Sequence, residues 1–208
     1  MNTQSIGIVD LGAGNINSVK RALRRIEIAA SVTTAAHHLE AFDKIILPGV
    51  GHFGRAMAEL KSRGLYDALN EAVLVKRKPV LGICLGMELM ARRSEEGDAD
   101  GLGWLDAEAV KFRFNDKRHF KAPHMGWNTV VADQDSSLFK GITSGEDEFY
   151  FAHSYYLGLT NEADAVATTS YETTFPSAIE RDNIFGVQFH PEKSHAAGLK
   201  ILRNFADI

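Results

Sequence analysis

The chain is poor in cysteine, in basic charge and in long apolar runs. Its single cysteine cannot form an internal disulfide, which is typical of proteins from a reducing compartment. There are 23 Lys and Arg against 27 Asp and Glu, a net charge of −4, so composition gives no basic face for nucleic acid. No apolar run approaches the roughly 18 residues that span a bilayer, and "MNTQSIGIVDLG" (1–12) lacks the features of a signal peptide. We expect a cytoplasmic protein with neither a membrane nor a nucleic-acid partner.

The first half alternates short apolar strands with amphipathic helices. The 208 residues, 45% hydrophobic and 24% charged, suit one globular domain covering positions 1–208. Strands are predicted at 5–10, 44–49 and 79–83, and helices at 15–27 and 64–77, where apolar residues recur at spacings of three and four. This alternation predicts an α/β fold with a doubly wound, mostly parallel central sheet and helices on both faces.

The second half has strand candidates at closer spacing. They lie at 107–112, 128–133, 148–156, 165–171, 177–182 and 184–189. A final helix is predicted at 194–206, opening at Ser194. We therefore expect antiparallel strands added to the parallel sheet in this half, within the same domain.

Residues 82–86 ("GICLG") place the only cysteine between two glycines, directly after a short apolar run. A strand ending at Ile83, followed by a helix-compatible segment, is the pattern of a nucleophile elbow, where glycines leave room for neighbouring backbone. Such a turn puts the Cys84 sulfur at a helix N-terminus, which favours the thiolate and a low pKa. It also directs the N–H of Leu85 toward a developing oxyanion. The alternative is a buried core cysteine beside chance glycines.

A thiolate nucleophile needs an oriented base, and "FHPE" (189–192) supplies the best candidate among eight histidines. Alternate residues of a strand share a face, so His190 and Glu192 are expected side by side. Glu192 can then hold one ring nitrogen while the other faces Cys84. Taken alone, the segment could also be a solvated turn.

Together these motifs resemble the signatures of the class I (triad) glutamine amidotransferases. The resemblance runs along the chain through "LPGVGHF" (47–53), "PHMGWN" (123–128) and "FYFAHSYY" (149–156), and it is greatest to subunits that serve a (β/α)8-barrel cyclase in histidine biosynthesis. It implies that Cys84 attacks the glutamine amide, and that His190, oriented by Glu192, protonates the departing ammonia. The ammonia passes to the cyclase, which forms imidazole glycerol phosphate and an aminoimidazole carboxamide ribotide. No metal or organic cofactor is implied.

The same resemblance assigns further positions one by one. The peptide at Val50 and Gly51 would reorient to give a second oxyanion N–H, and adjacent glycines make such a flip inexpensive. Positions that would line the glutamine pocket are Gly49, Glu88, Glu96, His153, Ser154 and Tyr155. Positions that would contact the cyclase are Asn15, Met125, Trp127, Tyr150 and Lys193.

The chain departs from the family at Glu88, where a glutamine usually follows Gly-Met. An ionised carboxylate only accepts hydrogen bonds, whereas an amide also donates, and its charge should raise the pKa of Cys84. Glu88 could remain protonated, or it could pair with Arg92 one turn later. We expect weaker glutamine binding or a shifted pH optimum, with the chemistry retained.

Three other functions stay open at this stage. The chain could serve a different synthase, of the anthranilate or aminodeoxychorismate type, with the same chemistry at Cys84. It could be a free-standing cysteine hydrolase, or an interaction subunit without activity. The isolated His119 and His124 do not indicate a metal site, and "GAGNIN" (12–17) has Asn17 where a dinucleotide fingerprint needs glycine.

Overall fold

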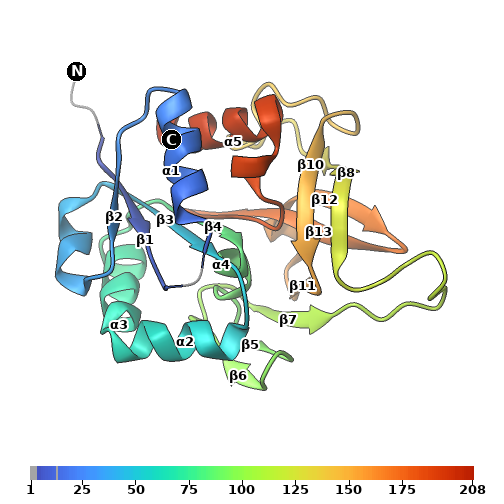
Figure 1. The fold of residues 1–208 in the computed structure, drawn as a ribbon, viewed down its shortest axis with the longest axis horizontal. Helices are drawn as coiled ribbons and strands as arrows, with labels where there is room; N and C mark the ends of the chain where they lie inside the picture. The colour runs from blue at the N-terminus through green and yellow to red at the C-terminus, as the bar shows by residue number, and fades with distance from the viewer. Residues whose placement is uncertain (1–3, 13) are drawn as a thin grey trace.

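In a computed structural model, which describes residues 4–12 and 14–208, an eight-stranded sheet forms the centre of the molecule (Figure 1). Its order is β2-β1-β3-β4-β14-β13-β12-β9. The parallel part contains β1 (Ile6–Val9), β2 (Ala30–Thr33), β3 (Lys44–Gly49), β4 (Val80–Cys84) and β14 (Ile184–Val187). The antiparallel part adds β13 (Thr173–Arg181), β12 (Ala165–Tyr171) and β9 (Val131–Ala132). The predicted mixed α/β sheet, parallel first and antiparallel later, is confirmed.

Helices cover both faces of this sheet, as predicted (Figure 1). On one face α1 (Ile16–Arg25) and α5 (His195–Asp207) bury their apolar sides in one hydrophobic core. On the other, α2 (Phe53–Ser62) and α3 (Leu65–Asn70), which continues as a π-helical turn (Glu71–Val75), bury theirs in a second core. Helix α2 and the edge strand β2 were not among the elements expected from the sequence. Among the described residues no helix is both long and apolar enough to cross a membrane.

Two smaller sheets flank the central one. One contains β11 (Tyr155–Leu159), β7 (Ala107–Lys111), β5 (Arg93–Ser94) and β6 (Ala99–Asp100), and the other is the hairpin of β8 (His124–Thr129) and β10 (Glu148–His153). The predictions of single strands at 148–156 and 128–133 were therefore wrong. In the first case the chain changes neighbours at Ser154, since β10 pairs with β8 whereas β11 pairs with β7. In the second, β8 ends at Thr129 and β9 joins the central sheet.

A buried lysine ties the end of α5 to the sheet. The side chain of Lys44 is 1% exposed, and its Nζ donates to the carbonyl oxygens of Phe205 (3.3 Å) and Ala206 (2.5 Å). These carbonyls belong to the last turn of α5, where a positive charge also interacts favourably with the helix dipole.

Replacing Lys44 by methionine should lower the free energy of unfolding by about 1–3 kcal/mol, because two buried carbonyls lose their donor. Urea unfolding measures the change. Lys20→Met is the matched control, since Lys20 is exposed on α1, and it should change stability by less than about 0.5 kcal/mol. Equal effects of the two substitutions would contradict a stabilising role for Lys44.

Candidate active site

Cys84 lies at a strained strand-to-helix turn. It ends β4 with φ 54° and ψ −114°, and the short helix α4 (Leu85–Glu88) starts at the next residue. The flanking glycines are required by close backbone contacts. A Cβ on Gly86 would lie 1.7 Å from the Leu47 carbonyl oxygen, and one on Gly82 would lie 2.7 Å from the Gly86 carbonyl. The predicted elbow geometry is present.

His190 and Glu192 follow the strand beside Cys84. In the parallel pairing of β14 with β4, Val187 lies opposite Ile83. The segments that follow these two strands therefore leave the sheet at the same edge. His190 Nδ1 is 3.0 Å from Glu192 Oε1, with side chains 3% and 1% exposed. The prediction of a shared strand face was wrong, because residues 191–193 form a 3-10 turn (η4, Pro191–Lys193) that brings the pair together. Because the carboxylate accepts, Nδ1 carries the proton and Nε2 is left free to act as a base.

The pKa of Cys84 does not follow the sequence expectation. The residue is 5% exposed, and burial, followed by the negative charge of Glu88, raises the pKa of the thiol above its ordinary value. A hydrogen bond from the N–H of Leu85 acts in the opposite direction and is outweighed. The prediction of a lowered pKa for Cys84 was therefore wrong for the chain on its own. The Cys84 sulfur lies 3.9 Å from the carbonyl oxygen of Ala152.

Glu88 is a buried carboxyl group at the end of α4, four residues after the nucleophile. It is 4% exposed, and its Oε1 accepts a 2.9 Å hydrogen bond from Nε2 of the fully buried Gln188. Burial raises the pKa of Glu88 to about 8, against the opposing effect of this hydrogen bond. The alternative pairing with Arg92 is excluded, since that guanidinium lies 2.8 Å from Asp106. Of the two outcomes that the sequence left open, protonation is the one that the structure favours.

The segment at residues 49–51 lies directly against the elbow. Gly49 is the register partner of Cys84, and a Cβ on it would be 3.0 Å from the Leu85 Cβ. Gly51 has φ +105° and is exposed, and a Cβ on it would meet no atom within 4 Å. The space next to the Gly51 Cα is therefore open, and its backbone has a φ that favours glycine.

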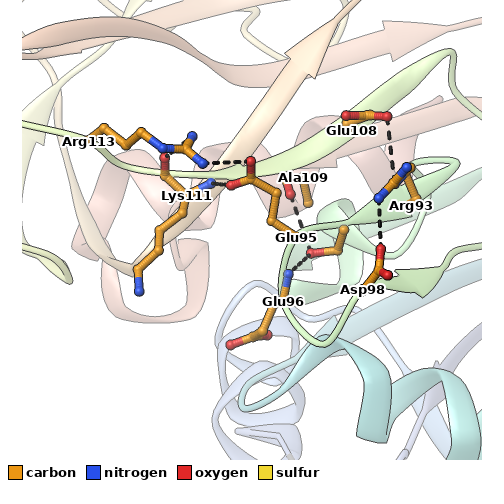
Figure 2. A network of polar contacts seen from close by, with 9 residues as sticks. Arg93, Glu95, Glu96, Asp98, Glu108, Ala109, Lys111 and Arg113 are labelled. Carbon is orange, nitrogen blue, oxygen red and sulfur yellow. Dashed lines mark hydrogen bonds and ion pairs between the residues drawn. The ribbon is translucent and has the colours of Figure 1, made fainter.

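Glu96 lies on a loop that ion pairs hold in shape (Figure 2). Arg93 Nη2 donates a hydrogen bond to Asp98 Oδ1 at 2.7 Å, and Arg113 Nη2 donates one to Glu95 Oε1 at 2.8 Å. The Glu96 carboxylate projects away from these pairs (Figure 2), and its Oε2 accepts a 2.6 Å hydrogen bond from the N–H of Phe53 at the start of α2. One carboxylate oxygen is thus already engaged within the chain.

Residues 153–155 span the junction of β10 and β11, where Ser154 alone separates the end of one strand from the start of the next. Ser154 and Tyr155 are half-buried, and burial, followed by the charge of Glu96, raises the pKa of the Tyr155 hydroxyl. The imidazole of His153 is buried, with both ring nitrogens hydrogen-bonded inside the protein. Its side chain therefore has no free donor or acceptor to offer a ligand.

The five positions expected at a partner face mostly gather on one surface. Met125 and Trp127 are 63% and 43% exposed on β8, and Trp127 is opposite Tyr150 in the register with β10. The Lys193 ammonium lies 5.4 Å from the centre of the Tyr150 ring. Asn15 precedes α1, which contacts the 3-10 turn η4 that ends at Lys193.

Two residues that support the site were not anticipated in this role. Gln188 holds Glu88, and Ser194 Oγ donates to the His190 carbonyl (2.7 Å) and accepts from the Tyr150 N–H (3.0 Å). Ser194 does precede α5 as predicted, although its side chain does not cap that helix. No local pattern in the sequence marks either function. Among the described residues there is no group of three or more His, Cys, Asp and Glu suited to a metal ion.

A buried cysteine elbow beside a His–Glu pair, on a mixed α/β sheet, is the arrangement expected of an amidotransferase. The family model for class-I glutamine amidotransferases matches residues 7–208, and the chain belongs to that class. A solved glutamine amidotransferase superposes with a TM-score of 0.76 over 98% of this chain and 99% of its own, at 20% identity.

Relatives at higher identity define the particular family. The chain is 43% identical over 203 residues to imidazole glycerol phosphate synthase subunit HisH 2 of Pseudomonas aeruginosa, covering 98% of this chain and 99% of that protein. It is 45% identical over 200 residues to the HisH 2 subunit of Methanococcus maripaludis, covering 96% and 98%. The chain is a member of the HisH family, the glutamine amidotransferase subunits of imidazole glycerol phosphate synthase.

Proposed function

We propose that the chain hydrolyses glutamine through Cys84, His190 and Glu192. His190 Nε2 removes the thiol proton, and the sulfur attacks the side-chain amide carbon to form a tetrahedral oxyanion. Collapse to a glutamyl thioester breaks the C–N bond, and the His190 imidazolium returns the proton to the departing ammonia. Water, deprotonated by the same imidazole, then releases glutamate. The observation that carries this proposal is the Cys84 elbow at the same sheet edge as the buried His190–Glu192 pair.

The oxyanion needs two donors, and the chain offers candidates on both sides of the sulfur. One donor would be the N–H of Leu85, the residue that follows Cys84 at the start of α4. A second N–H would come from the peptide at Val50 and Gly51, after it reorients. Glutamine itself would contact Gly49, Glu88, Glu96, Ser154 and Tyr155.

We infer that the partner is the (β/α)8-barrel cyclase subunit of the synthase and that the complex works in the cytoplasm. Exposed Met125 and Trp127, with Tyr150 and Lys193 beside them, provide the aromatic and cationic anchors that protein interfaces favour. Cys84 and His190 are 5% and 2% exposed, so glutamine access requires some opening. Docking of the cyclase on this face would supply it, which fits a subunit that is nearly inactive alone.

The experiment measures glutamate release by the purified chain alone and mixed with the cyclase and its ribonucleotide ligand. We expect stimulation of at least about tenfold, because interface binding must shift the buried site to an open form. Cys84→Ala sets the background. Activity without stimulation would retain the triad and point to another synthase. No activity in any mixture would contradict the proposal.

A further inference from the structure

A buried pair of histidines lies beside the nucleophile and takes no part in the steps above. His124 and His153 are register partners in β8 and β10, and they are 3% and 5% exposed. His124 Nδ1 is 3.0 Å from His153 Nε2. The residue before His153 is Ala152, whose carbonyl oxygen is the one 3.9 Å from Cys84 Sγ.

The hydrogen bonds of this pair run in one direction. His153 Nδ1 is 2.7 Å from the Tyr155 carbonyl oxygen, which can only accept, so Nδ1 carries the proton. In a neutral ring Nε2 is then bare, and His124 Nδ1 must donate to it. The bare Nε2 of His124 faces Nδ2 of Asn128 at 3.4 Å. That amide is oriented independently, since its Oδ1 accepts from the Thr129 N–H at 2.9 Å.

Aromatic packing keeps both rings neutral. The His124 ring stacks on the rings of Tyr171 and Phe151, with distances between ring centres of 4.1 and 4.8 Å. The His153 ring packs against Phe175, with 5.2 Å between the ring centres. Burial lowers the pKa of His124 to about 4 and that of His153 to about 3. The hydrogen-bond pattern requires each ring to carry one proton, on Nδ1, and therefore to be neutral. The lowered pKa values of the two buried rings agree with that pattern.

We propose that His124 and His153 are positioning residues, whose hydrogen bonds link the β8–β10 hairpin that carries Trp127 to the Tyr155 carbonyl at the start of β11 and so fix the backbone of residues 153–155. This role rests on the proposed function, which makes residues 153–155 a pocket wall and Trp127 a partner contact. His153 then contributes to the pocket through its backbone, because both of its ring nitrogens are engaged.

The first test reads the ring tautomers directly. Long-range proton–nitrogen NMR spectra of the ¹⁵N-labelled chain near neutral pH should show both histidines neutral and protonated on Nδ1, which is the minor tautomer of a free histidine side chain in water. An Nε2–H tautomer or a charged ring at either position overturns the proposal. Because no glutamine is involved, this result is independent of whether the chain is a glutaminase.

The second test uses a double variant that keeps the shape of the pair. His124→Phe with His153→Phe removes both partners of the histidine–histidine bond together, so neither ring nitrogen is left unpaired, and only the bond to the Tyr155 carbonyl loses its donor. We expect the double variant to remain folded, with its urea unfolding midpoint lowered by the loss of that one donor. Its KM for glutamine in the cyclase mixture should rise about tenfold with a smaller change in kcat, since the wall is misplaced.

Thr169→Val is the matched control, since Thr169 is 2% exposed and its hydroxyl donates to the Thr129 carbonyl oxygen at 3.1 Å on the same hairpin. It removes a buried hydrogen bond of β8 without touching residues 153–155, so KM should stay at the wild-type value. A folded double variant with wild-type KM and kcat overturns the proposal. Failure of the proposed function is distinguishable, since the wild-type protein itself would then release no glutamate.

Discussion

Replacing Glu192 by glutamine should lower the kcat of glutamine hydrolysis by about 10⁴-fold, the size of effect known for the equivalent change in a serine protease triad. Glu192 Oε1 accepts the proton of His190 Nδ1 at 3.0 Å, which leaves Nε2 bare for the Cys84 proton. An amide that presents its NH₂ group forces the opposite tautomer. An amide that presents its carbonyl oxygen keeps the tautomer but removes the charge that stabilises the imidazolium. The Glu192 side chain is 1% exposed, so solvent water has no access to accept the Nδ1 proton in place of the carboxylate.

Steady-state glutamate release in the cyclase mixture measures this loss, and single-turnover kinetics assign it to the chemical step. KM should change little, because the Glu192 side chain is 1% exposed and its hydrogen bond is to His190. Glu146→Gln, an identical change at an exposed position, is the matched control. A kcat within about tenfold of the wild type would mean that Glu192 does not orient the base.

The elbow was predictable from sequence because its constraint is local. Gly82 and Gly86 are required by contacts within a few residues or with the adjacent strand β3. The His190–Glu192 pair was also found, although for the wrong reason. Pro191 begins a 3-10 turn rather than continuing the strand, and a two-residue spacing brings side chains together in either geometry.

Features that depend on distant parts of the chain could not be predicted. The pKa of Cys84 is raised by burial within the tertiary fold and then by the charge of Glu88, and the local argument from a helix N-terminus gave the opposite direction. The partner of Glu88 is Gln188, 100 residues away. The break at Ser154 reflects which strands pair on either side, and that choice belongs to the tertiary fold.

Replacing Glu88 by glutamine should stabilise the protein more strongly as pH rises. The pKa of Glu88 rises from 4.5 to about 8 on folding, so the folded state binds the proton more tightly. The stability tied to neutral Glu88 is complete below about 4.5 and is lost as pH rises through about 8. Glutamine has no proton to lose and keeps the length needed to meet Gln188. The variant should therefore be more stable by an amount on the order of 5 kcal/mol above pH 8, and by much less near pH 5.

Urea unfolding of both proteins at about pH 5 and about pH 9 tests this directly. Parallel pH dependences would show that Glu88 is ionised throughout the range. Oε1 of Gln188 is buried with no protein hydrogen-bond partner among the described residues. An ionised Glu88 would offer this oxygen no donor, because a carboxylate only accepts hydrogen bonds.

The same substitution should separate the charge of Glu88 from its contact with substrate. Ionised Glu88 raises the pKa of Cys84, so in the wild type a rise in pH above about 8 also creates a charge that opposes the thiolate. With Glu88→Gln, iodoacetamide should label Cys84 about tenfold faster at about pH 9, with little difference near pH 6 where Glu88 is neutral. A lower KM for glutamine near pH 6 would then report the added amide donor rather than the lost charge. Identical labelling and KM at every pH would mean that Glu88 acts on neither the nucleophile nor the substrate, and that Gln188 is its only functional contact.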